Sequence, residues 1–255
     1  MDPISSFVMG HVAGKVVDYT TRHFQVQIIE RWSKYRAKQF FDEFCTEVEL
    51  ELGGTHSEKL NDSLSKLLAD DAGSEALFDA YRRVTLAKSK IIGPRLIGII
   101  TAELVLQRRM ANEFEDILLT AAENLTDEEM IGYSSFCREQ LTLADDPKNE
   151  DVTFDEKGGL RIKWCDEQFD SNWKSKEPVS ISPIDLGECL GRWASRLKEY
   201  GVISADIREC SWEYEEDSER HIDSNGTIRE ISWWIYIPKP FFRLAEIVER
   251  VSQRK

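Results

Sequence analysis

The hydrophobic period changes once along this 255-residue chain, and that change constrains the fold more than any other feature. Up to about residue 143, apolar residues recur three and four positions apart, which is the period of an amphipathic helix. After residue 151 they alternate with polar residues, as in the segment LRIKW at 160–164, which is the period of a strand. We therefore predict an α+β, mainly α protein: an α-helical bundle over 1–143, an acidic linker at 144–151, and an α+β module with a long β-hairpin over 152–255.

The most apolar stretch of the first part is IIGPRLIGIITAELVL, residues 91–106. It is too short to span a bilayer and is interrupted by Arg95 and Glu103, so we expect a helix that Pro94 opens and that is buried at the centre of the bundle. Thr126 and Glu129 have the spacing of a capping box at the start of a helix. The other expected helices cover 3–19, 28–48, 55–68, 77–84, 112–124 and 126–141, with a loop and helix cap at 71–74.

In the second part, Gly158 and Gly159 predict a turn before a strand over 159–164. Ser182 and Pro183 are a cap and first-turn pair for one helix that ends at Tyr200, before Gly201. Strands at 203–212 and 228–237 are expected to pair as a hairpin with its tip at 223–226. A closing helix is expected over 241–251.

The stretch LGRWASRLKEYGVIS at 190–204, followed by the hairpin and the closing helix, resembles the second half of a winged-helix domain. The resemblance covers about 182–251 and implies a recognition helix near 186–200 in a DNA major groove, with the wing on the backbone. The contact residues implied are Arg192, Arg196 and Lys198. A helical part followed by such a module, without catalytic motifs, also resembles orphan regulatory and phage-defence proteins of bacteria and prophages.

Charge argues against the DNA-binding alternative. The chain has 33 basic and 47 acidic residues, a net charge of −14, which excludes binding to nucleic acid or an anionic membrane by bulk charge. Acids concentrate at the expected hairpin tip, where they would oppose phosphates and favour a partner with a basic surface. These candidate partner-binding residues are Glu213, Glu215, Glu216, Asp217 and Glu219.

Two tryptophans at the hairpin add to this candidate interface. Trp233 and Trp234 are consecutive in a predicted strand, so their side chains point to opposite faces and one faces outward unless it is covered. Tryptophan is enriched at binding hot spots. Near the start of the chain, Gly10 and Gly14 are four apart and allow close helix packing within the bundle or across a homodimer.

No phosphate-binding loop, metalloprotease motif or nucleophile elbow occurs in the sequence. The five cysteines lack the spacing of a zinc site, and without a secretory signal they are expected to be buried, reduced thiols of a cytoplasmic protein. We therefore expect no cofactor, no metal, no membrane span and no catalytic residue, and a regulatory protein that binds another protein, including a nucleic-acid-binding one. The alternatives are a winged-helix transcriptional regulator and an enzyme whose site assembles from distant residues.

Overall fold

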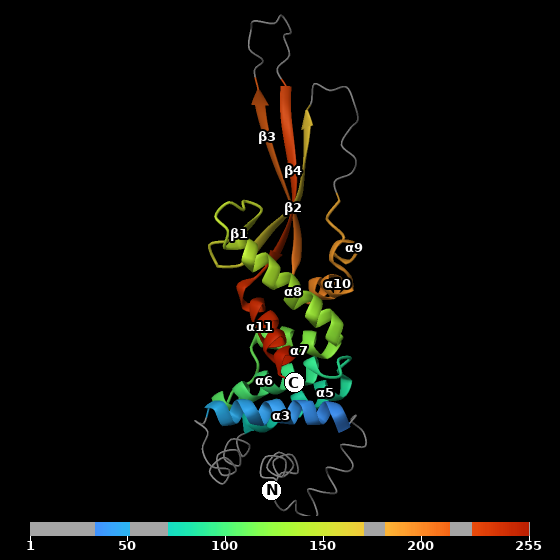
Figure 1. Ribbon diagram of the computed structural model, residues 1–255, viewed down its shortest axis with the longest axis vertical. Coiled ribbons are helices and arrows are strands. Elements are labelled where there is room, and N and C mark those ends of the chain that lie inside the picture. The colour runs from blue at the N-terminus through green and yellow to red at the C-terminus, as the bar shows by residue number, and fades with distance from the viewer. Residues whose placement is uncertain (1–33, 52–70, 171–181, 215–225, 255) are drawn as a thin grey trace, which may run out of the picture. The chain divides into compact units, whose positions relative to one another are not determined.

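The computed structural model describes residues 34–51, 71–170, 182–214 and 226–254 (Figure 1). These residues belong to two compact units. The first unit contains the described residues up to Ser134 together with those from Arg243 onward, and the second runs from Ser135 to Phe242. A helical part comes first in the described chain, and a part that combines a four-stranded antiparallel sheet with further helices follows it, which confirms the predicted α+β, mainly α class. The predicted domain boundaries on either side of 144–151 stay a prediction.

The first unit is built around helix α6 (Ile92–Gln107), which packs against α3 (Lys34–Glu51), α5 (Asp71–Leu86) and α7 (Glu113–Asn124). Twelve of its 16 residues are buried, because the helix is apolar on nearly every face. A Cβ added at Gly98 would lie 2.6 Å from the carbonyl oxygen of Phe40, so glycine is what allows α6 to approach α3 this closely. The central buried helix predicted from the sequence is confirmed.

Side chains satisfy the free backbone groups at the helix starts of this unit. Asp127, the first residue of α8 (Asp127–Ala144), accepts hydrogen bonds from the N–H groups of Lys90, Ile91 and Ile92, so a carboxylate from a later helix caps α6. The capping box predicted ahead of α8 is confirmed: Glu129 N–H donates to Thr126 Oγ1 at 3.3 Å, and Thr126 N–H donates to Glu129 Oε2 at 2.9 Å.

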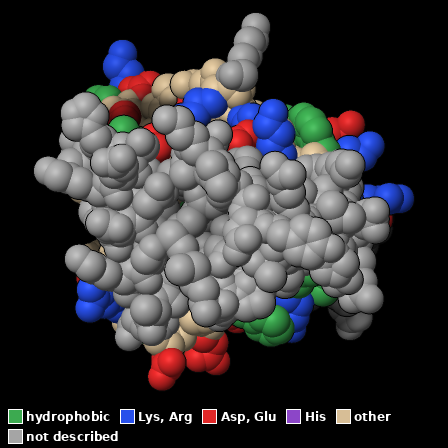
Figure 2. All heavy atoms as spheres, turned by 90° about the horizontal axis from the view of Figure 1, so that it is seen from below, with side chains coloured by type: hydrophobic (Ala, Val, Ile, Leu, Met, Phe, Trp, Pro, Cys, Tyr) green, Lys and Arg blue, Asp and Glu red, His purple; other side chains and the backbone are tan. Residues whose placement is uncertain are grey.

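The buried charges of the first unit are paired. Glu115, only 4 % exposed, accepts hydrogen bonds from both terminal nitrogens of Arg109 at 2.5 and 2.7 Å, and from the N–H of Asn112. The hydrogen bond from Arg109 lowers the pKa of Glu115 more than burial raises it. The described side chains visible at the rim of the view in Figure 2 include both acidic and basic groups.

Several predicted helix limits of the first part need correction or lie outside the described residues. Residues 71–74 were expected to form a loop and a helix cap, but they belong to α5, which covers Asp71–Leu86. The helix expected to stop at 141 continues to Ala144. The helices expected over 3–19 and 55–68, and the beginning of the one over 28–48, lie outside the described residues.

The second unit contains one antiparallel sheet in the order β1-β2-β4-β3. The strands are β1 (Val152–Phe154), β2 (Leu160–Asp170), β3 (Ser204–Tyr214) and β4 (Gly226–Ile237). The predicted hairpin is the pair β3 and β4, and the predicted strand at 159–164 is the first half of β2, which runs six residues further. Strand β1 was not predicted.

One face of this sheet carries the apolar side chains of the unit's core. Leu160 and Ile162 of β2 lie on it opposite the buried Ile237 and Ile235 of β4. Helix α10 (Arg192–Glu199) adds the buried side chains of Trp193, Ala194 and Leu197, and the Trp193 ring packs 5.5 Å from that of Phe136.

The single helix predicted between Ser182 and Tyr200 is wrong. It is divided at Gly191 into α9 (Leu186–Leu190) and α10, because Gly191 has a φ of 95°, a conformation that ends one helix and that side chains disfavour. The cap is Asp185 and not Ser182: its carboxylate accepts from the N–H groups of Gly187 and Glu188. The predicted stop at Gly201 is confirmed by its φ of 76°, and the closing helix is α11 (Phe242–Gln253).

Candidate binding surface on the four-stranded sheet

Strands β2, β4 and β3 extend well past the core of the second unit as a three-stranded ribbon (Figure 1). We call residues 166–170, 209–214 and 226–230 the distal arm. Its side chains on β2 from Asp166 to Gln168 and on β3 from Glu209 to Ser211 are all exposed, whichever face of the ribbon they lie on. The ribbon is therefore held here by backbone pairing to the central strand β4, and its side chains are available to a partner.

The distal arm is acidic. It contains six acidic residues and one basic residue, a net charge of −5. Arg229 donates to Glu209 across the strands at 2.7 Å, and Lys163 at the base of the arm lies 2.5 Å from Asp166 and 3.6 Å from Glu230. The exposed Glu167 has no ion pair with any residue that the structure describes.

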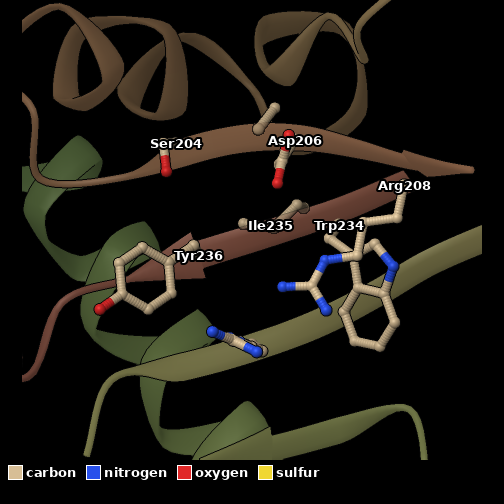
Figure 3. Close-up of a pocket in the computed structure, with 8 residues that line it drawn as sticks. Ser204, Asp206, Arg208, Trp234, Ile235 and Tyr236 are labelled. Atoms are coloured by element: carbon tan, nitrogen blue, oxygen red, sulfur yellow. The ribbon is translucent and has the colours of Figure 1, made fainter. Parts of the chain in front are cut away.

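At the base of the arm, the face of the sheet opposite the core contains a hollow of about 310 Å³. The strand register aligns Arg161 of β2 and Ser204 of β3 on either side of Tyr236, and Asp206 beside Trp234. Ser204 and Asp206 point into the hollow from β3, and the Arg208 side chain extends over Trp234 toward the side where Tyr236 lies (Figure 3). The Arg208 guanidinium carbon is 5.3 Å from the centre of the Trp234 ring.

Tyr236 is held in place at one end of this hollow. Its hydroxyl interacts with the carboxylate of Asp155, which also accepts from the N–H of Gly159 at 2.7 Å. Burial alone would raise the pKa of Asp155, but these hydrogen bonds outweigh it and lower the pKa; burial and the same carboxylate raise the pKa of Tyr236. A Cβ at Gly159 would lie 2.5 Å from the Tyr236 hydroxyl, so only glycine leaves room for the ring.

The two adjacent tryptophans point to opposite faces of β4, as predicted. Trp234 lines the hollow, and its indole N–H is buried without a hydrogen-bond acceptor among the described residues. Trp233 is on the other face, where its indole N–H donates to the Ser182 carbonyl at 3.0 Å. Of the pair, Trp234 is the one placed at a candidate binding surface, and whether it contacts a partner stays a prediction.

The three basic residues of the DNA-binding alternative all lie on α10 and differ in their exposure. Arg192 and Lys198 are exposed on α10, whereas Arg196 is half-buried. At about 100° per residue, Arg192 and Arg196 share one side of the helix and Lys198 lies roughly 120° around from Arg192. Glu188 and Glu199 are exposed nearby in the sequence, so the described surface of α9 and α10 has mixed charge.

Other predicted sites fall outside the described residues. These are Gly10 and Gly14, the proposed helix or dimer contact, and the tip acids Glu215, Glu216, Asp217 and Glu219. The side chain of Glu213 is also outside the description, although its backbone belongs to β3.

All five cysteines are free thiols, but the expected burial is wrong for three of them: Cys165, Cys189 and Cys210 are exposed. In the described ranges no group of three or more His, Cys, Asp or Glu side chains could hold a metal ion. No helix within those ranges has both the length and the apolar character needed to cross a bilayer.

No protein-family model, no curated protein and no solved structure matches the chain.

The hollow is the feature that sequence reasoning missed. The hollow is built from residues that lie up to 75 positions apart in the sequence, from Arg161 to Tyr236, with Arg208 between them. They lie close together only because β2 pairs with β4 and β4 pairs with β3. The available signal was the alternation on β4 of Trp234 and Tyr236, which places two aromatic rings on one face. The register of β2, which brings Arg161 to that face, has no such signal.

Proposed function

We propose that this protein acts by binding another protein through the distal arm, and that the partner presents a basic surface. The observation that carries the proposal is the arm itself: side chains exposed on both faces of a ribbon with a net charge of −5. Such a surface contributes little to the core. Its negative electrostatic field attracts a basic partner and increases the rate at which the two proteins associate.

Edge geometry supports the same proposal. In the described part of the sheet, β3 pairs with β4 alone, so its other edge has no strand beside it. Exposed edge strands in natural sheets carry charged side chains that discourage non-specific pairing with other strands. Strand β3 has three charged residues within four positions, namely Asp206, Arg208 and Glu209. A partner that complements these charges gains specificity from the same feature.

The test is an affinity capture from the lysate of the protein's own host cells, with and without nuclease. The arm variant neutralises five acids of the distal arm: Asp166, Glu167, Asp170, Glu209 and Glu213 to Asn or Gln. The control variant neutralises five exposed acids of the first unit, Glu49, Glu51, Glu75, Glu113 and Glu128. We expect one stoichiometric partner that survives nuclease, that the control variant retains and that the arm variant loses.

Loss of the partner from both variants alike would contradict the proposal, because it would trace the attraction to net charge and not to the arm. The winged-helix regulator is the second candidate. It requires that all captured material disappear with nuclease, and that Arg192→Glu with Arg196→Glu abolish binding. A regulatory role in phage defence stays a prediction, since it depends on architecture alone.

A further inference from the structure

The hollow on the outer face of the sheet has a chemistry that the acidic arm does not share. Two of its lining residues are arginines and one is an aspartate, so it is locally basic in a chain of net charge −14. At about 310 Å³ it is at the small end of ligand sites, large enough for one compact group.

Two aromatic side chains stand beside each other at this hollow. Trp234 and Tyr236 are two residues apart on β4 and therefore share a face, with their Cα atoms about 7 Å apart. Asp155 interacts with the Tyr236 hydroxyl and Gly159 leaves room for the ring, so the protein itself supports this wall. Flat ligand rings stack on aromatic side chains. When these side chains are already held in position, less conformational entropy is lost on binding.

The two arginines are available to an anion. Neither Arg161 nor Arg208 has a hydrogen bond or salt bridge to a described residue, although Arg161 is close enough to Asp155 to lower the pKa of that carboxyl. The guanidinium carbon of Arg208 lies 5.3 Å from the centre of the Trp234 ring, a distance typical of a cation–π contact, and such a contact does not use the N–H groups as hydrogen-bond donors. Asp206, the acid of the hollow, already accepts the Ile207 N–H at 2.8 Å.

We propose that this hollow binds a nucleotide, with the base against Trp234, Tyr236 or the Arg208 plane and the phosphate on Arg161 and Arg208. A simple anion makes no use of the aromatic wall, and an apolar ligand makes no use of the two guanidinium groups. A nucleotide uses both, and stacking requires an unpaired base, as in a free nucleotide or a single strand. The proposal does not depend on the arm's partner.

The experiment uses the full chain and three probes: AMP, UMP and a fluorescein-labelled dT12 strand, at 50 and 200 mM salt. The test variants are Arg161→Gln with Arg208→Gln, and Trp234→Ala. The matched controls are Lys148→Gln, which removes an exposed positive charge elsewhere in the unit, and Trp164→Ala, which removes a tryptophan that is 40 % exposed on β2 and not part of the hollow. Circular dichroism establishes that each variant is folded.

We expect saturable binding that each test variant weakens by about tenfold or more and that each control changes by less than about twofold. Tighter binding of dT12 than of UMP assigns the ligand to a single strand, and equal binding assigns it to a free nucleotide. The proposal is overturned by the absence of saturable binding to all three probes, or by equal losses in the test and control variants. It is also overturned if inorganic phosphate competes as well as the nucleotides, since the base would then contribute nothing.

Discussion

Helix α6 and the distal arm differ in what their side chains do: those of α6 pack in a core, and those described on β2 and β3 of the arm face solvent. Twelve of 16 residues of α6 are buried, whereas the described side chains of the arm on β2 and β3 are all exposed. The first region is held by packing and the second by backbone pairing to one central strand. The comparison teaches that a substitution in α6 should change stability, and that one in the arm should change binding while leaving stability nearly unaltered.

The largest expected effect is that of Gly98→Ala in α6. The new Cβ would lie 2.6 Å from the Phe40 carbonyl oxygen and 3.2 Å from the Phe44 amide nitrogen, so α3 must move away. We expect a loss of about 3 kcal/mol in the free energy of unfolding, at the upper end of overpacking effects. Urea denaturation measures it, and a loss below about 1 kcal/mol would show that the two helices separate easily.

Glu115→Gln should have the next largest effect, about 2–3 kcal/mol, because it leaves Arg109 without its buried carboxylate. The exposed Glu113 on the same helix is the control, and Glu113→Gln should change stability by less than about 0.5 kcal/mol. If both substitutions changed the free energy of unfolding equally, burial of the Glu115 carboxylate would not be the reason for its effect on stability.

The pH dependence follows from the same residue. The pKa of Glu115 is lower in the folded protein than its ordinary value of 4.5, so its stabilisation is fully present above that value and is lost as the pH falls through the folded pKa. The wild-type protein should therefore lose more stability than Glu115→Gln on acidification from pH 6 to pH 3. Parallel thermal melting curves for the two proteins over this range would contradict the assignment.

A smaller effect is expected at the base of the arm. Gly159→Ala should displace the Tyr236 hydroxyl from Asp155 and cost about 1–2 kcal/mol, since a side-chain tip can shift more easily than a backbone. Nucleotide binding should weaken with it. Unchanged binding in this variant would mean that the Tyr236 ring is not needed in its observed position.

The smallest effect on stability is expected for Glu167→Lys in the arm. The side chain is exposed and has no ion pair to a described residue, so the free energy of unfolding should change by less than about 0.5 kcal/mol. Binding to the basic partner should weaken, because the charge at this position changes sign. A stability change as large as that of Glu115→Gln would break the comparison between the two regions.

The parts of the fold that could be predicted from the sequence are those where local chemistry is decisive. The apolar run of α6, the Thr126 and Glu129 capping box and the Gly201 stop each determine structure over a few residues. The second half of β2 could not be predicted, because the segment CDEQFD has no apolar alternation and is a strand only through its pairing to β4. The break at Gly191 was hidden because the apolar spacing continues across it.

The candidate sites divide in the same way. The opposite faces of Trp233 and Trp234 follow from the strand period and could be predicted. Of the acids predicted at the hairpin tip, those at 215–219 lie outside the described residues, and the acids on β2 were not predicted as part of one surface with them. The hollow could not be predicted, because its two arginines come from different strands and only the register brings them beside Tyr236. From one sequence, site residues could therefore be predicted when they belong to one strand or helix. They could not be predicted when the register between strands brings them together.

The central claim is that the distal arm is the partner-binding surface, and hydrogen–deuterium exchange of the full chain with and without the captured partner tests it most directly. The arm's edge amides on β3 have no strand beside them in the described structure, so they should exchange in the free protein and become protected in the complex. We predict that protection gained on binding is concentrated at 166–170 and 209–214. Protection confined to α10 around Arg192 and Lys198, with no change in the arm, would contradict the account.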